Sequence, residues 1–151
     1  MIRFAVNQKS GKKIADSFWV RCLKEIQVSL KLKGNQEISI ALVSDQEIKK
    51  FNRIYRRKNQ VTDVLSFSQQ DSCLKYPLKS GQYLGEIIIG YPQAKRQAKI
   101  AKNSLNQELK LLLTHGFLHL LGYNHQKSSQ AKVMQRLEDK IIAGQGIISR
   151  R

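Results

Sequence analysis

The sequence predicts one α+β domain over residues 1–151, in which a small mixed β-sheet of about four strands is packed with about five helices. Segments with alternating apolar residues, typical of half-buried strands, are interspersed with segments whose apolar residues recur at helical spacing. No internal repeat or linker divides the sequence, and 151 residues are enough for one hydrophobic core. Hydrophobic residues make up 41% and charged residues 25% of the chain, which is ordinary for a globular protein.

The N-terminal segment predicts a strand followed by a helix. Residues 1–6 alternate as a short strand does. Residues 11–33 carry apolar side chains at helical spacing, and Gly34 provides a C-terminal stop. The side chains on this apolar face are Ile14, Phe18, Cys22, Ile26 and Leu30. We therefore expect one amphipathic helix after the first strand.

The next predicted pair is a strand and a helix that meet at Ser44. Residues 37–43 alternate as a half-buried strand, and Ser44 with Glu47 has the spacing of a capping box. In that motif the serine side chain accepts a hydrogen bond from the N–H of the third helical residue, and the glutamate side chain accepts one from the backbone N–H of the serine. The apolar side chains of this helix are Ile48, Phe51 and Tyr55. An aromatic residue at such a position can stack on a base but is more often in the core, so we expect Tyr55 to be buried.

Two further strands and a basic helix are predicted in the middle of the chain. The strands are residues 61–68 and 83–89, and the polar segment 69–82 between them is predicted to be a loop. Pro92 suits the first turn of a helix. The basic face of that helix consists of Lys95, Arg96, Lys99 and Lys102.

The most apolar helix is predicted near the C-terminus. After a break at Ser104, residues 105–121 leave little polar surface, and a helix this apolar is usually central and buried. Gly122 ends it. A last helix is predicted over residues 129–142. Its apolar face consists of Val133, Met134, Leu137 and Ile141.

The net charge predicts a polyanionic partner. The chain has 27 Lys and Arg against 11 Asp and Glu, a net charge of +16. Nucleic acid is the commonest partner for this balance, because neutralising phosphates releases condensed counterions. An anionic membrane surface is the alternative, but it would require a basic amphipathic helix or a lipidation signal. The first residues alternate as a strand, and no apolar run is long enough to span a bilayer, so we expect a soluble, cytoplasmic protein without a membrane partner.

All three histidines of the chain lie in the segment 115–125. His115 and His119 are four residues apart on the predicted helix, so their imidazoles lie on one face and can converge on one cation. Gly122 lets the chain turn back after the helix, which brings His125 into reach as a third ligand. Three nitrogen ligands leave a tetrahedral ion one open position, as in catalytic zinc sites. The sequence therefore predicts one Zn²⁺ per chain, the alternative being three ordinary histidines without a metal.

The predicted ion would activate a water molecule or polarise a phosphoryl oxygen, which indicates hydrolysis. The spacing is that of a zinc-peptidase-like histidine helix, His-Glu-x-x-His-x-x-Gly-x-x-His, except that Gly116 occupies the position of the Glu. Because that Glu is the general base of those peptidases, peptide cleavage by their mechanism is disfavoured. Glu108, two turns before His115, is either an acceptor for a ligand imidazole or, more commonly in such cases, a solvated surface carboxylate.

A run of cations ends the helix that begins after Ser44. Helix-end electrostatics explains some of them, but an arginine fork can also hold a phosphate and stabilise a pentacoordinate phosphorus. Asp63 and Ser66, in the strand that follows, face either a functional edge or solvent, and both interpretations stay open. The residues predicted to contact RNA in this region are Arg53, Arg57, Lys58 and Ser66.

With these two stretches in view, the chain resembles the YbeY family of bacterial rRNA-maturation endoribonucleases along nearly its whole length. The most specific motif is His-Gly-x-Leu-His-Leu-x-Gly-Tyr-x-His at residues 115–125. The second is Tyr-Arg-x-Lys at residues 55–58, followed by Thr-Asp-Val-Leu-Ser-Phe at residues 62–67. Residues 84–87 and the pair Met134 and Glu138 match weaker family patches.

The resemblance implies that His115, His119 and His125 are the zinc ligands. It also implies that Arg56 acts in catalysis together with His115 and contacts the RNA phosphate. The activity it implies is single-strand-specific RNA cleavage in maturation of the 16S rRNA 3′ end and in ribosome quality control, with the ribosome or a ribosomal protein as partner. The implied fold places the histidine helix beside a small mixed sheet.

Three positions depart from the family pattern. Asn124 stands where Asp usually precedes the third histidine, and Asn59 and Val61 stand where the family usually has Asp and Pro. Because two carboxylates of the family pattern are missing here, the sequence does not predict how the metal ligands are oriented or how rigid the loop after residue 58 is. Two alternative functions also stay open, a ribosome-associated RNA-binding assembly factor with a structural metal and, less favoured, a metallopeptidase. The sequence predicts no oligomeric state.

Overall fold

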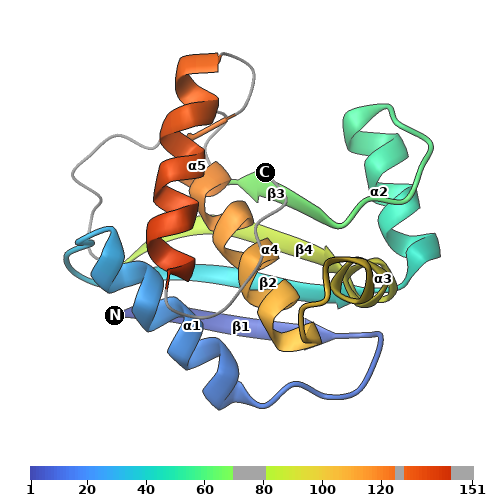
Figure 1. Ribbon diagram of the computed structural model, residues 1–151, viewed down its shortest axis with the longest axis horizontal. Helices are drawn as coiled ribbons and strands as arrows, with labels where there is room; N and C mark the ends of the chain where they lie inside the picture. The colour runs from blue at the N-terminus through green and yellow to red at the C-terminus, as the bar shows by residue number, and fades with distance from the viewer. Residues whose placement is uncertain (70–80, 125–127, 144–151) are drawn as a thin grey trace.

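The computed structural model describes residues 1–69, 81–124 and 128–143. Four strands and five helices in these ranges confirm the predicted α+β fold class (Figure 1). The elements, in chain order, are β1 (Ile2–Gln8), α1 (Asp16–Ser29), β2 (Gln36–Val43), α2 (Asp45–Arg56), β3 (Val64–Ser68), β4 (Gln82–Gly90), α3 (Tyr91–Ala101), α4 (Leu105–Leu120) and α5 (Ser128–Ile142). The predicted loop over residues 69–82 lies mostly outside the described residues.

The four strands form one mixed sheet in the order β1-β2-β4-β3. The β1–β2 and β2–β4 pairs are parallel, whereas β3 pairs with β4 in the antiparallel direction. Strand β3 is therefore an edge strand. One edge of β3 forms backbone hydrogen bonds with β4, and side chains from other elements can bond to the other edge.

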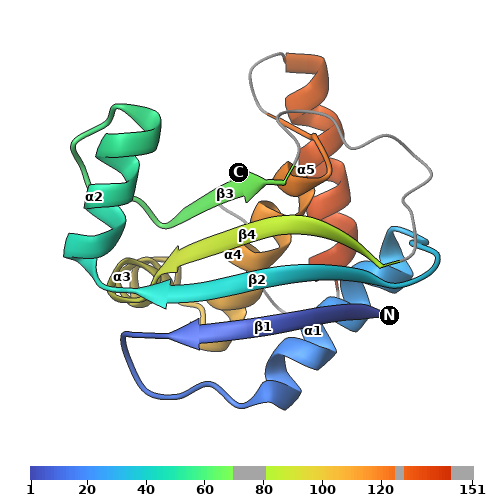
Figure 2. The ribbon, with the colours of Figure 1, turned by 180° about the vertical axis from the view of Figure 1, so that it is seen from behind.

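Helices cover one face of the sheet and leave much of the other open. Helices α1, α3, α4 and α5 lie on the first face, as Figure 1 shows. Seen from behind in Figure 2, strands β1, β2 and β4 lie in front of these helices, and α2 stands beside β3. The main core on the first face includes Trp19, Ile26, Ile40, Ile87, Leu112 and Phe117. A smaller cluster joins α2 to the second face through Ile48, Ala41, Val43, Leu65 and Ile88.

The first helix is shorter than predicted at both ends. Its N-cap is Ala15, and the chain before it is held by Gln8, whose side-chain oxygen accepts from the N–H of Ile14 at 2.9 Å. At the other end, Lys31 adopts a positive φ of 54°, which interrupts the helix before Gly34. Tertiary contacts and a left-handed residue thus override a continuous apolar pattern.

Two other differences concern β3 and α5. Strand β3 begins at Val64 rather than at residue 61, and just before the predicted start the carbonyl of Gln60 accepts from the Asn52 side chain of α2 at 3.0 Å. On α5, Val133 is 42% exposed although the spacing placed it on the buried face, whereas Met134 is fully buried. None of the described helices is long and apolar enough to cross a membrane.

Candidate active site

Helix α4 carries the histidine pair and begins at a complete capping box. The N–H of Gln107 donates to Ser104 Oγ at 3.1 Å, and the N–H of Ser104 donates to Gln107 Oε1 at 2.8 Å. At the start of α2, the N–H of Glu47 donates to Ser44 Oγ, but the Glu47 carboxylate lies 3.6 Å from Nζ of Lys9. Of the two bonds of the capping box predicted at Ser44, only the one to the Ser44 side chain forms. The complete capping box lies at Ser104, where from the sequence we predict only a break before the helix. Helix α4 is buried along most of its length, as its apolar sequence predicts.

The two histidines of α4 meet at their Nε2 atoms, which lie 3.0 Å apart. Their rings are nearly perpendicular, with an interplanar angle of 79° and centroids 4.5 Å apart. His115 is buried and His119 is half-buried. The imidazoles therefore converge as the four-residue spacing predicts. Their role as metal ligands stays a prediction.

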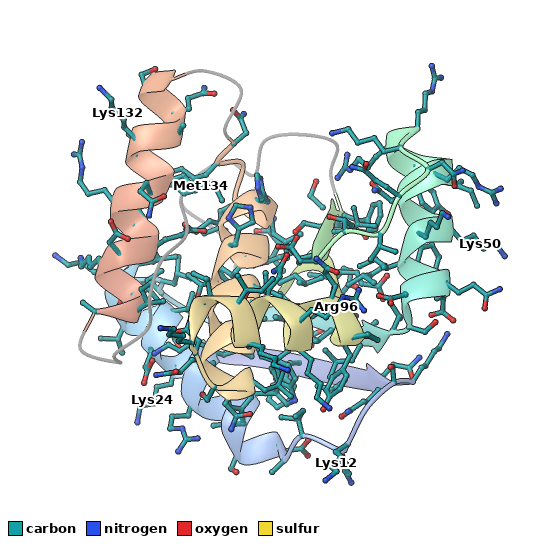
Figure 3. All side chains as sticks on the ribbon, turned by 45° about the vertical axis from the view of Figure 1, so that its right-hand side comes forward. Lys12, Lys24, Lys50, Arg96, Lys132 and Met134 are labelled. Atoms are coloured by element: carbon teal, nitrogen blue, oxygen red, sulfur yellow. The ribbon has the colours of Figure 1, made fainter. Side chains whose placement is uncertain are left out.

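A buried carboxylate on α5 supports the inner histidine. Oε1 of Glu138 lies 2.5 Å from Nδ1 of His115, and Glu138 is fully buried. Because a carboxylate only accepts, Nδ1 carries the proton, and the lone pair of His115 is left on Nε2, which faces His119. Met134, one turn before Glu138, is also fully buried and points from α5 towards α4 (Figure 3). Sequence reasoning placed Glu138 in a weak family patch but assigned it no role.

The sequence suggested Glu108 as an acceptor for a ligand imidazole or as a surface carboxylate, and the structure contradicts the surface position. Glu108 is fully buried, and its Oε1 accepts from Nε2 of Gln97 at 3.1 Å. The same Nε2 donates to Oδ2 of Asp63 at 3.1 Å. Gln97 therefore ties α4 and α3 to the segment before β3. Asp63, left open by the sequence, belongs to this structural network.

Arg56 reaches the edge strand beside the histidine helix. Its Nη2 donates to the carbonyl oxygen of Ser66 at 2.9 Å, and its guanidinium carbon lies 5.5 Å from the centre of the Phe67 ring. The hydroxyl of Ser66 donates to the carbonyl oxygen of Gly116 at 3.1 Å. Since Gly116 follows His115, this chain of contacts links the predicted catalytic arginine to the histidine helix.

The remaining predicted RNA contacts lie on the exposed C-terminal end of α2. Arg53, Arg57 and Lys58 are all exposed. Arg57 ends the helix in the left-handed conformation, with φ at 58°. A shallow cavity of about 530 Å³ on this helix is lined in part by Lys49, Lys50, Arg53 and Asn59. Among the described contacts, Arg56 and Ser66 connect to the histidine helix, while these three cations form a basic surface beside it.

Tyr55 is exposed, which contradicts the expectation that it belongs to the core. Its side chain is 59% exposed, although its ring contacts Phe51 and Phe67. The helical periodicity is correct, but the last turn of α2 extends past the sheet (Figure 2). Phe67 of β3 contacts the Tyr55 ring at this end of the helix but leaves most of it exposed.

The third predicted ligand, His125, lies outside the described residues. The turn before it is described. The N–H of Tyr123 donates to Leu118 O at 3.1 Å, the N–H of Gly122 donates to His119 O at 3.0 Å, and Gly122 has φ at 97°. These are the two bonds of a Schellman motif, in which a left-handed glycine reverses the chain after a helix. The predicted left-handed turn at Gly122 is thus confirmed, whereas the approach of His125 to the histidine pair stays a prediction.

The described residues contain no group of three or more His, Cys, Asp or Glu side chains that could hold a metal ion, but the spacing of the histidine pair is compatible with two of the three predicted zinc ligands. Two nitrogens at ordinary zinc distances from one tetrahedral ion lie about 3.3 Å apart, close to the observed 3.0 Å. A ligating imidazole also usually donates its other N–H to a carboxylate, as His115 does to Glu138. The described residues therefore fit a metal. They provide two nitrogen ligands and one supporting carboxylate.

The fold and the site together define a small α+β protein whose central helix carries a carboxylate-backed histidine pair, beside a sheet edge that an arginine of α2 contacts. Comparison with known proteins identifies the family. The family model described as Endoribonuclease YbeY matches residues 3–146. The chain belongs to this family.

Individual relatives agree with this assignment. The chain is 36% identical over 147 residues to the Endoribonuclease YbeY of Heliobacterium modesticaldum, covering 93% of this chain and 86% of the relative. It is 39% identical over 144 residues to that of Persephonella marina, covering 94% and 92%. The solution structure of TM1509 from Thermotoga maritima has the same fold, with a TM-score of 0.58 at 24% identity, covering 94% of this chain and 89% of that one.

Proposed function

We propose that this protein is a metal-dependent endoribonuclease that cuts single-stranded RNA, with one Zn²⁺ held by His115, His119 and His125. The observation that carries the proposal is the convergence of the two Nε2 atoms, 3.0 Å apart, with the buried Glu138 carboxylate behind one of them. The family name supports RNA cleavage, and the net charge of +16 supports a polyanionic substrate.

Each residue has a distinct part in this proposal. The ion, when bound, would supply a Lewis acid and an activated water molecule. Glu138 holds the Nδ1 proton of His115 and fixes the orientation of its ring. Arg56 is positioned by the Ser66 carbonyl at the edge of β3, where its free N–H groups can hold a phosphate.

Peptide cleavage by the zinc-peptidase mechanism does not fit this site. A Cβ at Gly116 would lie 2.8 Å from Cγ2 of Ile87 and 3.1 Å from Oγ of Ser66. A side chain at this position therefore points into the sheet. It could not present a general base to the histidine pair.

The cellular role belongs to the same proposal. We place the protein in the cytoplasm, acting on ribosomal RNA in maturation of the 16S rRNA 3′ end and in ribosome quality control. The ribosome or a ribosomal protein would then supply the site specificity that a small basic surface lacks.

The test combines metal analysis with RNA cleavage. The purified protein is expected to hold about one zinc ion per chain, as the predicted three-histidine site requires, and to cut an unstructured RNA faster than a duplex of the same sequence. His125→Ala is expected to lose the metal, and His119→Ala and Arg56→Ala to lose cleavage. Lys24→Ala, which removes one charge from α1 (Figure 3), is expected to cut normally.

Two outcomes would contradict the proposal. Equal cleavage by His119→Ala and the unchanged protein would mean that the nuclease is a contaminant. If chelation unfolds the protein, as judged by its melting temperature, the ion is structural, and the assembly-factor alternative is favoured.

A further inference from the structure

The geometry points to a base-binding subsite on the aromatic cluster of Phe51, Tyr55 and Phe67, in which Tyr55 stacks on a nucleobase of single-stranded RNA whose phosphate lies at Arg56. The ligand is a base of any identity in an unpaired strand. The inference rests on the proposed function for the role of Arg56. It goes further by naming what recognises the unpaired base.

The Tyr55 ring is exposed but held in place. Its side chain is 59% exposed, while its ring centre lies 6.3 Å from that of Phe51 in a stacked arrangement and 5.2 Å from that of Phe67 in an edge-on arrangement. Phe51 and Phe67 are half-buried and packed on the smaller core cluster. Phe51 and Phe67 are therefore fixed against the core, and Tyr55 is the member of the cluster that solvent reaches.

The cluster adjoins the predicted phosphate contact. The centre of the Phe67 ring lies 5.2 Å from that of Tyr55 and 5.5 Å from the guanidinium carbon of Arg56. Arg56 is in turn bound to the Ser66 carbonyl, and the Ser66 hydroxyl donates to the carbonyl oxygen of Gly116. Tyr55 and Arg56 thus both contact one aromatic ring, so the base and the phosphate of a single nucleotide can reach both side chains.

The surrounding charge matches a nucleic-acid strand. The end of α2 exposes Arg53, Arg57 and Lys58 next to Tyr55, and Lys50 projects from the same helix into solvent (Figure 3). An exposed aromatic ring among cations is the arrangement of single-strand binding surfaces, where cations follow the backbone and rings stack on bases. A base in a duplex already stacks on both faces, so this subsite selects unpaired RNA without selecting its sequence.

The experiment measures equilibrium binding of the full chain to an unstructured RNA oligonucleotide. Every variant carries His119→Ala, so that the RNA stays intact. Tyr55→Ala is expected to weaken binding about 5- to 150-fold, the range for loss of one base stack. Tyr55→Phe, which keeps the ring, is expected to bind normally. Ile54→Ala is the matched control, because it truncates a neighbouring side chain that is 53% exposed.

Abasic oligonucleotides separate stacking from a purely structural role. A set of RNAs, each lacking one base, is expected to contain one whose binding to the Tyr55-containing chain is weakened. Tyr55→Ala should cause no further loss with that RNA. If Tyr55→Ala binds the intact RNA normally, or weakens every abasic RNA equally, the inference is wrong. Because binding is measured without cleavage, a protein that binds in this way but never cuts RNA would contradict the proposed function and not this subsite.

Discussion

At the scale of single residues, the contact between Glu138 and His115 determines the chemistry of the site. It selects the tautomer of His115 by placing the proton on Nδ1, 2.5 Å from the carboxylate. Glu138 is fully buried, so the orientation of the ring does not depend on solvent. Carboxylates in this position generally increase the basicity of a metal-binding imidazole.

Replacing Glu138 by glutamine is expected to weaken zinc binding about 10- to 100-fold. The shape of the side chain is retained, but the negative charge behind the imidazole is lost. Zinc affinity would be measured by competition with a chromophoric chelator, and folding by the melting temperature.

Asp139→Asn is the matched control for this change. Asp139 is exposed, is the next residue on α5 and accepts from Nε2 of Gln135 at 2.9 Å. Its loss of charge should leave zinc affinity unchanged. Equal affinities for all three proteins would show that Glu138 only fills space.

At the scale of elements, the close approach of α4 to the sheet positions the histidine helix. A Cβ at Gly116 would lie 2.8 Å from Cγ2 of Ile87, which is fully buried in β4. Real Cβ atoms do not approach so closely, so α4 or the strand would have to move. The absence of a side chain at Gly116 lets α4 lie against β4, and it also lets the Ser66 hydroxyl reach the helix backbone.

We expect Gly116→Ala to destabilise the protein by up to about 2 kcal/mol. Alanine gains about 1 kcal/mol over glycine in a helix interior, but overpacking of a core costs about 1–3 kcal/mol. Urea denaturation measures the difference. In an Ile87→Ala background the clash with Ile87 is removed and only the contact with Ser66 Oγ remains, so the same change should be less destabilising. A destabilisation that is identical in both backgrounds would exclude this packing explanation.

At the scale of the whole molecule, positive charge is spread over several elements. Lys12, Lys24, Lys50 and Lys132 project in different directions in Figure 3. The net charge of +16 therefore attracts RNA from all sides, whereas the predicted phosphate contacts are concentrated at α2 and β3. A general field increases the rate of encounter, and localised contacts determine how the strand is oriented.

Salt dependence should distinguish these two contributions. The logarithm of the RNA-binding constant should fall linearly with the logarithm of salt concentration, with a slope of about −0.7 per phosphate contacted. Arg56→Ala should reduce the steepness of this slope by about one contact, or about 0.7. Lys24→Ala removes the same charge from α1 and should leave the slope unchanged. Equal slopes for these two variants would contradict a localised contact at Arg56.

Several features could be predicted from the sequence because they depend on neighbours along the chain. The helical repeat alone brings His115 and His119 together, and a left-handed glycine alone predicts the reversal at Gly122. Alternating apolar residues identified the four strands, and apolar residues at helical spacing identified the five helices. Helix and strand ends were less predictable, because side-chain hydrogen bonds of Gln8 and Asn52 hold the chain just before α1 and β3.

Only the tertiary structure decided which distant side chains complete the site. Glu138 reaches His115 because α5 packs against α4, and Glu108 is buried because Gln97 of α3 binds it. Tyr55 is exposed because α2 extends past the sheet, although its position in the helix is that of a core residue. These outcomes depend on how elements pack across the fold, and periodicity within one element contains no information about its neighbours.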